Sequence, residues 1–134
     1  MASLIVERGR LRFGQQTFES TNYNAARNIQ VMSVDDSSTA LIASATTLGS
    51  PTNLYDAAFD ATPTETLPAT IVCVMTIPTG SGNFTIRRLC EHDDTAGNVT
   101  GSSTTLCSGV DAQALTKTSD FSLAITKSFS VTSV

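Results

Sequence analysis

The sequence predicts an all-β fold, either an antiparallel β-sandwich or a jelly roll with an extended N-terminal segment. Thr and Ser are unusually frequent, with 21 and 16 of the 134 residues, whereas charged residues make up only 15%. Thr favours strands because its branched Cβ suits a pleated surface. Short apolar runs alternate with turn sequences rich in Gly, Asp and Ser, as in sandwiches. We therefore expect less than about a tenth of the residues in helices.

The length of the chain is that of one domain, and the sequence divides it into an arm and a body. Residues 1–28 hold a short apolar stretch followed by a polar, aperiodic segment, and we expect an N-terminal strand and a polar arm there. Apolar runs recur regularly only in residues 29–134, which we expect to form the sandwich body.

The strongest strand signal is the β-branched run Thr70–Ile77. The turn sequence Pro78–Asn83 follows it, and Phe84–Cys90 then resumes a strand pattern, so the sequence predicts a hairpin with a loop of about five residues. Further expected elements are a strand from Ile29 to Val34, a strand or short helix over Thr39–Leu48, a helical turn over Leu54–Phe59, a polar loop over Glu91–Ser102, and strands over Thr104–Cys107, Phe121–Thr126 and Phe129–Val134.

The single histidine, His92, is the natural starting point in a search for chemistry. Together with Asp93 or Asp94 it offers an imidazole and a carboxylate to a metal ion, and with Cys90 it shares a face of an extended strand. No second histidine is present, and no serine lies in a Gly-x-Ser-x-Gly elbow. We interpret residues 91–94 as a solvated loop and expect neither catalytic nor metal-binding nor cofactor-binding residues, so that the chain is not an enzyme.

The three cysteines are an odd number without close pairing, and each has apolar or Thr neighbours. We expect Cys73, Cys90 and Cys107 to be buried and unpaired. The net charge of −4 argues against nucleic-acid binding, and no apolar run is long enough to span a membrane. The start of the chain has no secretion signal, which favours synthesis in a cytoplasm.

Positive charge is concentrated at the N-terminus, where residues 1–30 carry a net charge of +2 against −6 for residues 31–134. On an extended strand three alternating arginines line one side, which fits either a charged edge strand or a basic arm that docks on an acidic partner. Apolar residues nearby would anchor such an arm. The predicted partner-binding residues are Arg8, Arg10, Leu11, Arg12, Phe13, Phe18 and Arg27.

Five segments of the chain form a recognisable series. They are the start Met1-Ala2-Ser3-Leu4-Ile5, the element Thr46-Thr47-Leu48-Gly49, the strand Thr85–Leu89, the Asp-rich loop His92–Thr100 and the closing run Asp111–Leu123 with Leu115-Thr116-Lys117-Thr118 before Asp120-Phe121. In these segments the chain resembles small structural proteins of tailed-bacteriophage virions. Arg87-Arg88 and Cys90–His92 depart from the more apolar strand typical of the group.

The resemblance implies a non-enzymatic virion component, made in the bacterial host cytoplasm, that contacts other virion proteins. A capsid decoration (cement) protein bound to the major capsid protein, and itself a homo-oligomer, is the first reading; a tail, collar or fibre component is the second. A carbohydrate-binding adhesin would also use a sandwich, but the chain has no Trp and only Tyr23 and Tyr55 as tyrosines. A small hydrolase would require His92 to have catalytic partners.

Overall fold

The computed structural model describes residues 3–5, 29–61, 64–66 and 70–130. Within these residues the chain contains strands and no helix, and all strand pairs are antiparallel, so the predicted all-β fold is confirmed. The strands are β1 (Ser3–Ile5), β2 (Val31–Asp35), β3 (Leu54–Ala58), β4 (Thr64–Thr66), β5 (Thr70–Ile77), β6 (Thr85–His92), β7 (Leu106–Thr116) and β8 (Leu123–Ser130). No helix in the described part is long and apolar enough to cross a membrane.

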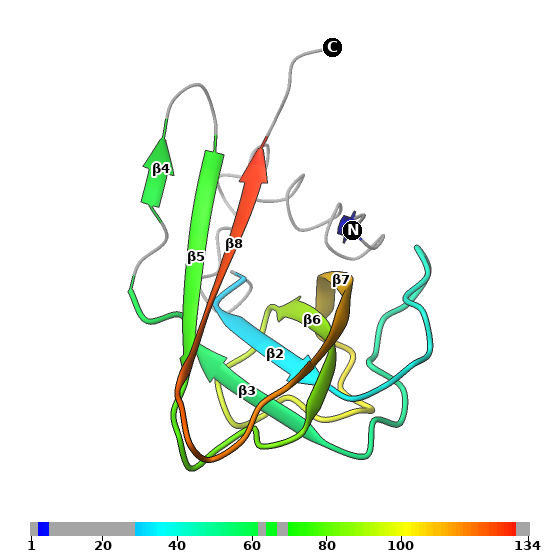
Figure 1. Ribbon diagram of the computed structural model, residues 1–134. Helices are drawn as coiled ribbons and strands as arrows, with labels where there is room; N and C mark the ends of the chain where they lie inside the picture. Colours follow the sequence, from blue (N-terminus) through cyan, green and yellow to red (C-terminus); the bar gives the residue numbers. More distant parts are fainter. Residues whose placement is uncertain (1–2, 6–28, 62–63, 67–69, 131–134) are drawn as a thin grey trace.

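The strands form two sheets that pack as a sandwich (Figure 1). The five-stranded sheet has the order β1-β7-β6-β2-β3, and the three-stranded sheet has the order β4-β5-β8. In the three-stranded sheet, β5 and β8 pair along their full length, from Thr70 opposite Ser130 to Ile77 opposite Leu123. The two longest described connections, residues 36–53 and 93–105, both belong to the five-stranded sheet.

The main core lies between the two sheets. Met32 and Val34 of β2 and Ile86 of β6 pack there against alternate residues of β5, which are Cys73, Met75 and Ile77. Alternation along a strand explains this set, because every second side chain points to the same face. The remaining residues of β2, Val31, Ser33 and Asp35, are directed to the opposite face of the five-stranded sheet, where they are also buried.

That opposite face is covered by the chain itself. Leu48 of segment 36–53 and Val99 of segment 93–105 pack with Val31, Cys90 and Leu106 in a second core. Gly109 of β7 permits segment 36–53 to approach the sheet closely, because a Cβ at this position would clash with the Leu41 side chain and with Cys90 Sγ. The two loops therefore form a layer over the sheet.

The predicted hairpin of Thr70–Ile77 with Phe84–Cys90 is wrong. The two segments are strands, but β5 pairs with β4 and β8, whereas β6 pairs with β2 and β7. The turn Pro78–Asn83 carries the chain from one sheet to the other, with positive φ at Gly82 and a hydrogen bond from the Ser81 N–H to the Pro78 carbonyl (3.1 Å). Because both strands carry apolar side chains for the same interior, they face each other across the sandwich instead of lying in one plane.

Three other element predictions are corrected. Leu54–Phe59 is not a helical turn, because residues 54–58 pair with β2 as strand β3. Thr39–Leu48 is neither strand nor helix but part of the covering loop. Phe121–Thr126 and Phe129–Val134 were expected to be separate strands, but the described part forms the single strand β8, whose pairing with β5 is uninterrupted from Leu123 to Ser130.

Candidate functional site

All seven residues predicted to bind a partner, Arg8, Arg10, Leu11, Arg12, Phe13, Phe18 and Arg27, lie outside the described residues. The N-terminal stretch is described only over β1, which pairs with Ser108–Val110 of β7. The first residues of the expected arm therefore belong to the five-stranded sheet as its edge strand. The described chain instead directs attention to a set of buried polar side chains.

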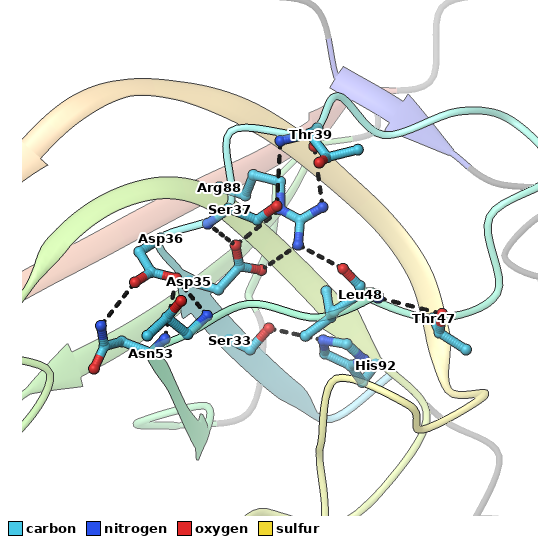
Figure 2. A network of polar contacts seen from close by, with 12 residues as sticks. Ser33, Asp35, Asp36, Ser37, Thr39, Thr47, Leu48, Asn53, Arg88 and His92 are labelled. Carbon is cyan, nitrogen blue, oxygen red and sulfur yellow. Dashed lines mark hydrogen bonds and ion pairs between the residues drawn. The ribbon is translucent and has the colours of Figure 1, made fainter.

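A buried ion pair joins β6 to β2 beneath the covering loop (Figure 2). Arg88 Nε donates to Asp35 Oδ1 (2.8 Å) and its Nη2 donates to Oδ2 (3.0 Å), a bidentate arrangement. The same guanidinium donates to the carbonyls of Thr39 (3.1 Å) and Leu48 (2.7 Å). Because both carbonyls belong to segment 36–53, one arginine ties this loop to the sheet at two points.

The ends of segment 36–53 are closed by the two adjacent aspartates. Asp35 Oδ1 accepts the Ser37 N–H (2.9 Å), and Asp36 Oδ1 accepts the N–H groups of Thr52 (2.9 Å) and Asn53 (3.0 Å). Asn53 Nδ2 also donates to Asp36 Oδ2 (2.7 Å). These hydrogen bonds lower the pKa of Asp36 against the opposing effect of desolvation. The two carboxylates thus hold the chain where it leaves β2 and where it returns to β3.

His92 is not part of a solvated loop, and the interpretation of residues 91–94 is corrected here. β6 continues to His92 because Val31 pairs with it, and Glu91 and His92 are fully buried while Asp93 is 6% exposed. His92 Nε2 lies 2.8 Å from Ser33 Oγ, and His92 Nδ1 lies 3.1 Å from Thr105 Oγ1. Burial lowers the pKa of His92 to about 4, so the ring is neutral near pH 7.

The Ser33–His92 contact has the composition of a nucleophile and a base, but its environment does not suit catalysis. Both side chains have no exposed surface, so a substrate has no path to Ser33 Oγ. The third group is the hydroxyl of Thr105, which carries no charge to stabilise an imidazolium. A ring with a pKa of about 4 is also a weak base. His92 is therefore a buried histidine whose two ring nitrogens each have a hydroxyl as hydrogen-bond partner.

A second buried ion pair bridges the two sheets. Lys127 of β8 donates from Nζ to Glu91 Oε2 of β6 (2.7 Å), and Ser108 of β7 donates to the same oxygen. Glu91 Oε1 is buried and has no hydrogen-bond partner among the described residues. Desolvation raises the pKa of Glu91, although the charge of Lys127 acts in the opposite direction.

A third buried cation fixes the turn between the sheets. Lys117 follows β7 and is 1% exposed. Its Nζ donates to Asn83 Oδ1 (2.9 Å) and to the carbonyls of Thr118 (3.2 Å) and Thr79 (3.5 Å). Two of these acceptors lie on the turn that connects β5 to β6, so Lys117 holds the point at which the chain changes sheets.

The cysteines are buried and none is in a disulfide, as the sequence predicted. Burial raises the pKa of Cys90 far above that of an ordinary thiol and raises that of Cys73 less strongly. A thiol with a raised pKa is a poor nucleophile and a poor metal ligand. In the described part of the chain, no three His, Cys, Asp or Glu side chains are grouped so as to hold a metal ion.

Sequence reasoning missed the buried polar residues that organise this structure. A signal was present in Val31–Asp35, where Ser33 and Asp35 alternate with apolar residues, and in Arg88-x-Cys90-x-His92 on the neighbouring strand. Polar residues at every second position of a strand lie on one face of the sheet. If the two strands are known to pair, the sequence therefore predicts that their polar side chains lie next to one another on that face. Comparison of the chain with protein-family models, with curated proteins and with solved structures found no match.

Proposed function

We propose that this chain is a non-enzymatic structural protein of a tailed-bacteriophage virion, a capsid decoration protein that stabilises the capsid by protein–protein contacts. The observation that carries the proposal is the use of the buried ionisable side chains. Arg88 pairs with Asp35 and also binds two carbonyls of segment 36–53. Glu91 pairs with Lys127 and so joins the two sheets. Such an arrangement favours a rigid docking module over a site that changes charge during a reaction cycle.

The sequence resemblance supports the same class, and its segments have clear structural places. Thr46–Gly49 lies in the loop that Arg88 ties down, and Thr85–Leu89 lies in β6, beside β2. A protein that repeats many times on a lattice gains stability from many weak contacts, provided that each copy presents the same shape. A loop layer that the Arg88–Asp35 ion pair ties to the sheet meets that requirement.

The first experiment is quantitative mass spectrometry of purified phage particles, with empty capsids and tails separated. A decoration protein is present in fixed stoichiometry with the major capsid protein in the capsid fraction. Recovery only in the tail fraction would make the chain a tail, collar or fibre component. Absence from all purified particles would refute the virion assignment, and glycan-array binding would then test the adhesin reading.

The second experiment tests the basic arm. Deletion of residues 1–28 would also remove β1, which pairs with β7, so substitution is cleaner than truncation. We expect the triple variant Arg8→Ser, Arg10→Ser, Arg12→Ser to bind undecorated capsids more weakly than the native chain does. The matched control is Arg87→Ser, which removes an exposed arginine from β6. Equal binding by the triple variant and the native chain would show that the arm does not dock.

A further inference from the structure

Strand β8 is an edge of the three-stranded sheet (Figure 1). All eight of its residues pair with β5 on one side, and no described strand pairs with its other side. A row of backbone N–H and C=O groups on a sheet edge is a template for another strand. In the described part of the chain, the outer side of β8 therefore offers its backbone N–H and C=O groups to another strand.

The other edges in the described part of the two sheets are poorer templates. Beyond the residues paired with β1, the outer side of β7 has six residues and begins with the exposed Asp111. β1 and β4 have three residues each. β3 has five residues, and its Asp56 carboxylate accepts the Gly97 N–H (2.5 Å), so segment 93–105 lies against that strand. β8 offers more backbone positions than any of these.

The side chains of β8 leave this edge without an exposed charge. Its outward row consists of Ala124, Thr126, Ser128 and Ser130, all of them small, uncharged and exposed. Lys127 is the only charged residue of the strand, and it points inward to Glu91 with 6% of its side chain exposed. A lysine that points inward can also protect an edge strand, because pairing with another strand would bury its charge, but Lys127 is already buried and paired with Glu91.

We propose that β8 is a dimerisation edge that pairs antiparallel with β8 of a second copy of this chain across a two-fold axis. The two three-stranded sheets then become one continuous sheet. A second copy fits because a two-fold contact places the edge of β8 against the same edge of the other copy. Two copies of a chain of net charge −4 repel each other, and contact through an uncharged edge keeps this repulsion small. Thr and Ser side chains opposite one another also form favourable cross-strand pairs.

The inference is independent of the proposed function, because self-association through β8 does not require a capsid. The adjacent row of β5 is consistent with it. Thr70, Val72 and Val74 pair with Ser130, Ser128 and Thr126, and the hydroxyls of Thr70 and Ser130 lie 3.2 Å apart. The outward side chains of β5 next to the edge are thus uncharged as well, and a strand added to β8 would bury no charged side chain there.

A cysteine scan tests the geometry directly. Ala124→Cys, Thr126→Cys and Ser128→Cys are made singly in the full chain and oxidised with copper phenanthroline; the native cysteines are buried and give little background. In antiparallel two-fold pairing, a residue near the axis lies opposite the same residue of the other copy. Two residues further along, the same position in the two copies is about 14 Å apart along the strands, because the copies run in opposite directions. We expect disulfide-linked dimers from one or two neighbouring positions and none from the exposed control Ser38→Cys. Equal cross-linking at all positions, or none at any, would overturn the proposal.

Sedimentation velocity over a range of concentrations measures the association itself. We expect the native chain to dimerise reversibly, and the double variant Thr126→Lys, Ser128→Lys to dimerise at least about tenfold more weakly, because like charges then face each other across the axis. Ser38→Lys is the matched control and should dimerise as the native chain does. A native chain that stays monomeric, or a dimer that the double variant leaves unchanged, would overturn the proposal. If the β8 amide protons that point away from β5 were protected from exchange in a monomer, the chain would cover its own edge.

Discussion

Glu91 of the five-stranded sheet and Lys127 of the three-stranded sheet meet inside the sandwich, with 2.7 Å between Oε2 and Nζ and at most 6% of either side chain exposed. Their contact is the one ion pair that joins the two sheets among the described residues. Lys127 belongs to the inward-facing row of β8, so its charge lies away from the exposed row of the strand. One pair of residues thus contributes to the packing of the sheets and to the uncharged character of the edge.

Removal of one partner of this pair should destabilise the fold strongly. Lys127→Met leaves the Glu91 carboxylate buried without its counter-charge, and we expect the free energy of unfolding to fall by about 3–5 kcal/mol. Replacement of the whole group by apolar residues, as Glu91→Leu, Lys127→Met, Ser108→Ala, should recover most of the loss. Urea denaturation at pH 7 measures both variants. A loss below about 1 kcal/mol for Lys127→Met would show that the ion pair contributes little.

The neighbours Glu91 and His92 should affect the pH dependence of stability in opposite directions. Unfolded His92 takes up a proton below pH 6.5, whereas the folded ring stays neutral to about pH 4, so its contribution is lost as the pH falls through this window. Unfolded Glu91 releases its proton near pH 4.5 while the folded carboxyl retains it to higher pH, so its contribution is lost as the pH rises. Just above pH 4.5 the two groups therefore act in opposite directions on stability.

Single variants separate the two contributions, each worth about 1.4 kcal/mol per pH unit within its window. Relative to the native chain, Glu91→Gln should gain stability as the pH rises above 4.5, and His92→Gln should gain stability as the pH falls below 6.5. Denaturation curves at half-unit intervals of pH give both differences. A constant difference between His92→Gln and the native chain would mean that the folded histidine titrates normally.

Arg88 and Arg87 are adjacent in sequence but should respond very differently to the same substitution. Arg88→Met leaves Asp35 unpaired and two loop carbonyls without their donor, so we expect a loss of about 3–5 kcal/mol and faster amide exchange in segment 36–53. Arg87→Met removes an exposed side chain and should change stability by less than about 0.5 kcal/mol. Similar losses for the two variants would contradict the assigned role of Arg88.

All three cysteine thiols should be outside disulfides but slow to react. A thiol reagent under denaturing, non-reducing conditions should detect three thiols per chain, because none is in a disulfide. In the folded protein the reaction should be much slower, since the thiols are buried and the pKa values of Cys73 and Cys90 are raised. Detection of a single thiol after denaturation would reveal a disulfide.

The sequence by itself determined the fold class and many of the strand segments. The β-branched run Thr70–Ile77 has few favourable conformations other than a strand. At the end of β2 the carboxylate of Asp35 accepts the N–H of Ser37, two residues further along the chain. The burial of the cysteines also followed from their apolar neighbours. These features depend on residues close together in the chain, and local physical chemistry is sufficient for them.

Only the tertiary structure decided which strands pair and where the charges lie. The turn at Pro78–Asn83 is compatible with a hairpin or with a change of sheet, and the choice depends on β8, which lies some fifty residues away. Arg87 and Arg88 are equivalent in sequence, but a register irregularity between Ile86 and Arg88 and the carboxylate of Asp35 bury only the second. A charge is buried where a distant partner compensates for its desolvation, and no local pattern contains that partner.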